Sequence, residues 1–169
     1  SIFVIFMDFG LGPVLTREVA RSKEKLKEVL EQVLGIKLVL VLGSLFLMYG
    51  SFFILRSFKE IPFDTVNLVY LASLIIVLDT FTFTFFSVFR AYQTMRYEAV
   101  GLVIYQILII ALGSTALAMR APIAYVIGAI IAGSLFHFIY SSTLVFHKLK
   151  LSPILRFSPS TAKTLLKIS

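Results

Sequence analysis

The sequence predicts an all-α membrane protein, a polytopic bundle of about four complete transmembrane helices and one partial helix. Of its 169 residues, 59% are hydrophobic and 15% are charged, whereas a soluble domain has about 45–50% apolar and about 25% charged residues. The mean hydropathy is +0.96. Helices that are hydrophobic all round are either deeply buried or in a membrane, and a chain this short has too little interior to bury several of them.

The apolar residues form successive segments, four of them close to the roughly 20 residues that cross a bilayer core. Short loops join these segments, so neighbouring helices are expected to be antiparallel. Gly10 to Pro13 is expected to loosen the partial helix near its end. The chain starts inside an apolar run without an initiator Met, so we expect residues 1–169 to be one incomplete N-terminal bundle. The expected spans are 2–15 (partial), 36–55, 68–89, 99–119 and 123–146.

The basic residues alternate between the two sides of these spans. Thirteen of the 16 Lys and Arg residues fall on one side, which the positive-inside rule makes cytoplasmic. The net charge of +7 is therefore a topology signal, and we do not expect nucleic acid as a partner. We expect a multi-pass protein of the cell membrane. Its cytoplasmic segments would be residues 17–37, 90–98 and the basic segment 147–169.

Residues 22–34 have the pattern of an amphipathic helix. Their apolar residues recur at the spacing of one helix face, and Lys27 and Glu31 form an i, i+4 pair. We expect a connector that lies along the cytoplasmic surface. The residues of its apolar face are Leu26, Val29, Leu30, Val33 and Leu34.

Polar residues occur near the middle of most spans. An ionisable group at bilayer depth is costly and usually belongs to a pathway or binding site. Asp8, Asp79, Gln106 and His137 fall at similar depth, which predicts a wet cavity between helices. Arg90 lies three turns beyond Asp79 on the same stripe. We expect a neighbouring row to serve helix packing and hydrogen bonding. That row is Ser73, Thr80, Thr84 and Ser87.

Small residues also recur at helical spacing, which lets helix backbones approach closely in lipid. Ala129 and Gly133 are one such pair, and Gly43 and Gly50 are another. By contrast, the sequence has no cysteine, no Ser/His/Asp array and no phosphate-binding glycine loop. With two His residues, a metal site is not expected either. The sequence therefore predicts no enzyme, no cofactor and no metal.

Two stretches resemble a known family. "DFGLGPVLTREVAR" resembles the end of the second helix and the following loop of prokaryotic oligosaccharide flippases. These are the polysaccharide-biosynthesis branch of the multidrug/oligosaccharidyl-lipid/polysaccharide exporter superfamily. "FRAYQTMRYEAVG" resembles the family's loop between helices four and five. The resemblance implies that the spans are helices two to six of an N-terminal lobe, with the first helix and the second lobe of a two-lobe transporter missing.

The resemblance also implies a function. Such proteins use alternating access to move an oligosaccharide linked to a polyprenyl phosphate or pyrophosphate to the outer leaflet. A sugar and phosphate head group cannot cross hydrocarbon without a wet groove. Arg17 and Arg90 would lie at the cytoplasmic mouth, where the planar guanidinium suits phosphate. The expected partners are this lipid-linked oligosaccharide, membrane lipids, the missing parts of the same protein and a coupling cation.

Two alternatives stay open. Asp79 matches no motif of that family, and an acid at mid-depth also fits a cation-coupled multidrug exporter of the same superfamily. The other alternative is not a transporter but a membrane scaffold or the subunit of a membrane enzyme. The scaffold predicts that the polar residues at mid-depth pair with one another and leave no cavity.

Overall fold

The computed structural model describes residues 11–58 and 63–148. No strand occurs within these residues, and four helices are long and apolar enough to cross a membrane, as the sequence predicted. Asp8, Lys59 and nearly all of the basic segment 147–169 lie outside the described residues. The elements are α2 (Leu11–Arg21), the 3-10 helix η1 (Lys23–Lys25), α3 (Leu26–Phe58), α4 (Phe63–Ala91), α5 (Arg96–Ala118) and α6 (Ile123–Lys148).

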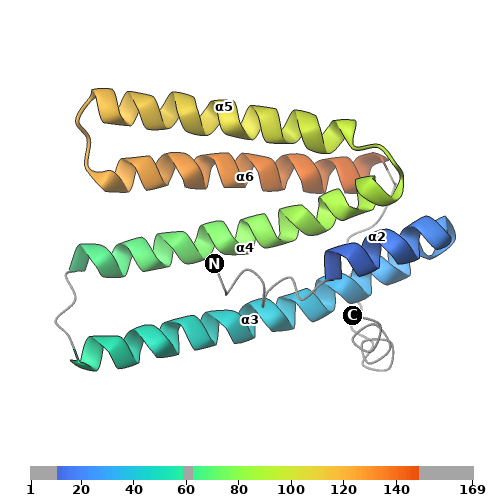
Figure 1. The fold of residues 1–169 in the computed structure, drawn as a ribbon, viewed down its shortest axis with the longest axis horizontal. Helices are drawn as coiled ribbons and strands as arrows, with labels where there is room; N and C mark the ends of the chain where they lie inside the picture. Colours follow the sequence, from blue (N-terminus) through green and yellow to red (C-terminus); the bar gives the residue numbers. More distant parts are fainter. Residues whose placement is uncertain (1–10, 59–62, 149–169) are drawn as a thin grey trace.

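The long helices lie side by side in the order α5, α6, α4, α3, and each runs antiparallel to the next along the chain (Figure 1). Short α2 packs where α3 begins and α4 ends. This arrangement gathers the start of α3, the end of α4, the start of α5 and the end of α6 at one end of the bundle. We call it the basic end, because it carries most of the described Lys and Arg residues.

The hydrophobic core lies at the basic end. Leu11, Leu15 and Val19 follow one another at i, i+4 and i+8 on α2 and are fully buried. They pack with buried apolar residues of the long helices, of which Val33 comes from α3 and Val145 from α6. Pro13 is tolerated in α2 because it lies in the first turn, where a missing N–H leaves no intrahelical bond unmade.

Helix α3 differs from the expectation of a separate surface connector. Residues 26–34 of the amphipathic segment and the following span form one helix of 33 residues, which is about 50 Å long and follows η1 directly. The apolar face predicted for residues 22–34 is confirmed, but it packs against protein: Leu30 and Val33 are buried in the core that includes α2. Lys27 and Glu31 form the expected pair at 4.0 Å.

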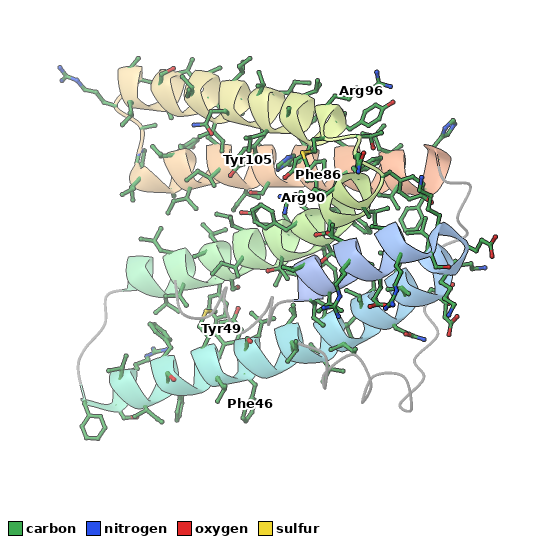
Figure 2. The ribbon with its side chains drawn as sticks, turned by 45° about the vertical axis from the view of Figure 1, so that its right-hand side comes forward. Phe46, Tyr49, Phe86, Arg90, Arg96 and Tyr105 are labelled. Carbon is green, nitrogen blue, oxygen red and sulfur yellow. The ribbon has the colours of Figure 1, made fainter. Side chains whose placement is uncertain are left out.

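The other end of the bundle is more open. Helix α3 exposes large apolar side chains there, and Phe46 points away from the bundle (Figure 2). A groove of about 740 Å³ opens between the end of α5 and the start of α6. An added Cβ at Gly43 or Gly50 would meet no atom within 4 Å, so the close helix approach expected there is not made by the described residues.

Candidate functional site

Helix α4 is the centre of the candidate site because it has two polar faces. One face, which we call the hydroxyl face, points toward α2 and α3 and carries the predicted row of hydroxyl residues. The other, the Asp79 face, points toward α5 and α6. The residues of the hydroxyl face are Ser73, Thr80, Thr84 and Ser87, and all four are buried.

The hydroxyl face is closed by hydrogen bonds. Thr84 and Ser87 donate to carbonyl oxygens one turn earlier on α4, at 3.1 and 2.9 Å. Thr16 of α2 donates from Oγ1 to the Ser87 carbonyl oxygen at 3.1 Å. Toward the open end, the hydroxyls of Tyr49 and Ser73 lie 2.6 Å apart, and Figure 2 shows Tyr49 on the side of α3 that faces α4. The prediction that this row serves helix packing is confirmed.

Lys37 is the residue of this face that sequence reasoning missed. Its side chain is fully buried, and its Nζ donates to the Thr84 Oγ1 at 2.6 Å. The sequence pattern places Lys37 in the expected cytoplasmic segment 17–37 and does not indicate a contact with α4. The signal was its position on α3, because it continues the apolar face of the amphipathic segment. The members of that face are Leu26, Leu30, Val33, Lys37, Val41 and Ser44, and all are buried.

The Asp79 face brings together two predicted residues and two others. The half-buried Asp79 carboxyl lies near the Ser134 hydroxyl of α6, and so does the Tyr105 hydroxyl of α5. His137 follows Ser134 by one helical turn, and its ring stacks on Tyr105 with 4.9 Å between centroids. The Phe86 ring of α4 is also close to the His137 ring, with 5.0 Å between centroids. We call Asp79, Tyr105, Ser134 and His137 the α4–α5–α6 cluster.

Close packing of α5 on α6 positions this cluster. A Cβ added to Gly133 would lie 2.8 Å from Ile109 Cγ1 and 3.3 Å from Tyr105 Cδ2, so only glycine fits without displacing the neighbours. The predicted small-residue contact is confirmed at Gly133. It lets the α6 backbone approach the Tyr105 ring. Neither Tyr105 nor Ser134 was among our sequence candidates, because a single Tyr or Ser in an apolar span has no distinguishing pattern.

The other predicted site residues lie elsewhere. Arg90 donates from Nε and an Nη atom to the two carboxylate oxygens of Glu98, with 2.8 Å for the Nε bond. Arg17 is exposed and lies 3.7 Å from Glu18. Gln106 is exposed on α5, outside the cluster, and Asp8 is not among the described residues. The structure therefore joins Asp79 and His137 and leaves Gln106 apart.

The connection between α4 and α5 holds Arg90 against Glu98. The chain leaves α4 through Gln93, which adopts a positive φ of 57°. The N–H of Gln93 donates to the Arg90 carbonyl at 3.0 Å, and that of Thr94 donates to the Phe89 carbonyl at 2.9 Å. This is the Schellman arrangement of a helix C-terminus. It turns the chain so that the first turn of α5 places Glu98 beside Arg90.

The described residues contain no group of three or more His, Cys, Asp or Glu side chains that could hold a metal ion. The chemistry within reach of the cluster is that of one carboxyl, two hydroxyls and one imidazole. Such groups exchange hydrogen bonds with water and bind small cations through oxygen. A polar cluster between long apolar helices is typical of membrane proteins that handle a polar solute.

The long apolar helices, the basic end and the polar groups inside the bundle define a polytopic membrane protein. A comparison with protein families identifies which one. Residues 1–169 match the family described as "polysaccharide biosynthesis protein", so the chain belongs to that family, which confirms the resemblance. It is a membrane protein of polysaccharide biosynthesis. No curated protein and no solved structure matches it significantly.

Proposed function

We propose that the full-length protein moves a polyprenyl-(pyro)phosphate-linked oligosaccharide across the cell membrane by alternating access, and is not an enzyme. The observation that carries the proposal is the family match over the whole chain, for a protein built of membrane-crossing helices. A biosynthetic pathway that builds a polysaccharide on a membrane lipid needs a step that carries the polar head group through hydrocarbon. That step requires polar groups at membrane depth.

The arrangement of α4 supports this function. Polar side chains follow the helix on both faces, from Ser73 near the open end to Arg90 at the basic end. The Asp79 face adds an acid and a histidine between helices, which cost more at membrane depth than the hydroxyls that join the helices on the other face. We propose that Asp79, His137, Gln106 and Asp8 face the solute in some state of the transport cycle, and that the basic end is cytoplasmic.

Arg90 is the proposed point of entry for the phosphate, and Arg17 lies at the same end of the bundle. The Arg90 guanidinium is about two-fifths exposed and already holds a carboxylate in a bidentate pair. A phosphate presents the same geometry with more charge. In this mechanism the incoming pyrophosphate competes with Glu98 for Arg90, and Glu98 takes the guanidinium back when the cargo leaves.

Transport of a labelled lipid-linked oligosaccharide into proteoliposomes tests the proposal. We expect Arg90→Ala to lower the rate about tenfold or more, because a charge-assisted hydrogen bond contributes about 1.5–3 kcal/mol. Arg56→Ala, at the opposite end, is the matched control and keeps the rate. Glu98→Gln separates the two roles of Arg90: a structural pair predicts the same loss as Arg90→Ala, whereas phosphate binding predicts a smaller one.

A cation-coupled multidrug exporter is the second candidate, because Asp79 forms no ion pair with any described residue. The same protein, expressed in a strain that lacks its oligosaccharide flippase, decides between the two. Restored surface polysaccharide without drug resistance supports the flippase. Drug resistance without restored polysaccharide overturns it in favour of the exporter.

A further inference from the structure

Lys37 places a positive charge inside the bundle. Its side chain is fully buried on α3, and its Nζ donates to the Thr84 Oγ1 at 2.6 Å. A hydroxyl oxygen accepts a hydrogen bond from an ammonium group but does not neutralise its charge. A buried charge is costly unless an opposite charge lies close to it. The position of Lys37 therefore favours a carboxylate nearby.

Helix α2 leads toward this position from the N-terminal side. It packs against both α3 and α4, and it runs in the same direction as α4, toward the basic end (Figure 1). The chain ahead of Leu11 therefore joins α2 at the end that faces the middle of the bundle. Residues 1–10 lie outside the described residues, and Asp8 precedes Leu11 by three positions. Three residues span at most about 11 Å, so the Asp8 Cα lies within that distance of the Leu11 Cα.

The periodicity of α2 gives the face on which Asp8 falls. Leu11, Leu15 and Val19 are buried, and Arg17 on the opposite side is exposed. Carried back along the helix, the same periodicity places Asp8 seven positions before Leu15 and eleven before Val19, which are two and three helical turns. The Asp8 side chain would therefore point to the same side as these two residues, toward the core that α2 shares with α3 and α4.

The contact between α2 and α4 gives the depth of Asp8 relative to Lys37. Thr16 Oγ1 donates to the Ser87 carbonyl oxygen, so these two residues lie close together along the bundle. Asp8 precedes Thr16 by eight residues, about 12 Å, and Thr84 precedes Ser87 by three, about 4.5 Å. Helical side chains lean toward the N-terminus and carbonyl groups point toward the C-terminus, which makes the difference in depth smaller than these lengths give. The flexible four-carbon stem of Lys37 can bridge what remains.

We propose that Asp8 and Lys37 form an ion pair that fixes the chain ahead of α2 against α3 and α4. Two charges that are each costly at this depth then neutralise each other, and the Thr84 hydroxyl accepts a further hydrogen bond from Lys37. Asp79 is not an equivalent partner, because it lies on the other face of α4, toward α5 and α6.

The pair stabilises the present arrangement of the bundle. In this arrangement the pair keeps Asp8 away from a solute. A movement that takes the chain ahead of α2 away from α3 has to separate two opposite charges where no water replaces the lost contact, which is costly. The pair does not depend on which cargo the protein carries.

Exchanging the two charges in the full-length protein tests the pair. Asp8→Lys alone puts two ammonium groups into one buried site and should lower the yield of folded protein about tenfold or more, measured by size-exclusion chromatography in mild detergent. Adding Lys37→Asp restores one charge of each sign and should recover most of that yield. Asp79→Lys with Lys37→Asp is the matched control and should recover none. The proposal is overturned if the exchange at positions 8 and 37 recovers no yield, or if the control exchange recovers as much.

Thiol cross-linking tests the same contact without reversing a charge. Residues 1–169 contain no cysteine, so pairs of cysteines are introduced into a cysteine-free full-length protein. A short bifunctional maleimide should cross-link the variant Asp8→Cys/Lys37→Cys in membranes. The control Met7→Cys/Lys37→Cys should cross-link much less, because Met7 lies about 100° around the helix from Asp8. Equal cross-linking of the two variants, or none in either, contradicts the pair. Neither experiment uses transport, so the proposed function is tested separately.

Discussion

The two faces of α4 both bury polar side chains between helices, but they differ in how those side chains are hydrogen-bonded. On the hydroxyl face, the buried polar groups are joined to one another: Lys37 to Thr84, Tyr49 to Ser73 and Thr16 to Ser87. On the Asp79 face, the Ser134 hydroxyl lies within reach of Asp79 and Tyr105, and the His137 Nε2 has no partner in the described structure. Polar residues inside a membrane bundle therefore need not share one role. The hydrogen bonds of the hydroxyl face hold α2, α3 and α4 together, whereas the Asp79 face gathers an acid, a histidine and two hydroxyls between α4, α5 and α6.

The largest expected effect breaks the hydroxyl face at Lys37. Lys37→Ala should lower the free energy of unfolding by about 2–4 kcal/mol, because it removes a long, fully buried side chain. Lys37→Met keeps most of the volume and should cost about 1 kcal/mol for the lost hydrogen bond. Denaturant unfolding in mild detergent measures both. The control is Lys27→Ala, whose side chain is 50% exposed. If Lys27→Ala costs as much, the hydroxyl face does not stabilise the bundle.

A smaller effect disturbs the Asp79 face through its backbone. Gly133→Ala should destabilise by about 1–3 kcal/mol, because its Cβ would meet Ile109 and push α6 from α5. Gly128→Ala is the control on the same helix, where an added Cβ meets no atom within 4 Å. That change should be neutral or stabilise by up to about 1 kcal/mol. Equal outcomes for the two variants would contradict the close α5–α6 contact that places Tyr105 beside Ser134.

The smallest expected effect concerns the turn between α4 and α5, which positions α5 beside the Asp79 face of α4. Gln93 has a positive φ of 57°, which glycine adopts without strain. Gln93→Gly should stabilise the protein by about 0.5–1 kcal/mol. In the helix interior, Gln106→Gly should have the opposite sign and cost about 1 kcal/mol. Both are measured by the same unfolding experiment. A loss of stability in Gln93→Gly would contradict the Schellman turn.

The membrane-crossing helices were predictable because an apolar stretch of about 20 residues indicates that the segment lies in lipid. The continuity of α3 was not, because residues 22–34 and 36–55 differ in the solvent they face and not in backbone preference. Gly35, which separates them, breaks a helix only weakly. The pattern of apolar and polar residues therefore locates the membrane crossings better than it locates the ends of helices.

The site was predictable only in part, for a related reason. Asp79 and His137 stand out as titratable groups in apolar spans, and the structure places both in one cluster. Gln106 has the same sequence signal, but it lies on another face of α5 and is exposed. Whether two residues meet depends on how each helix is rotated about its axis, which the spacing of polar residues in the sequence does not determine. The close contact of Gly133 with Ile109 belongs to that packing. The contact of Lys37 with Thr84 was not predicted, because charges were grouped by loop and not by helix face.

The unbroken length of α3 has a mechanical consequence. No proline interrupts its 33 residues, and α2 packs against α3 only near the first turns of α3. A rigid rod of about 50 Å enlarges a tilt along its length: a tilt of about 5° about its first turns displaces the far tip by about 4 Å, together with α4, to which Lys37 and Tyr49 join it. A small movement of α3 beside the charged residues of α2 would therefore give a larger movement of its C-terminal end, at the opposite side of the membrane.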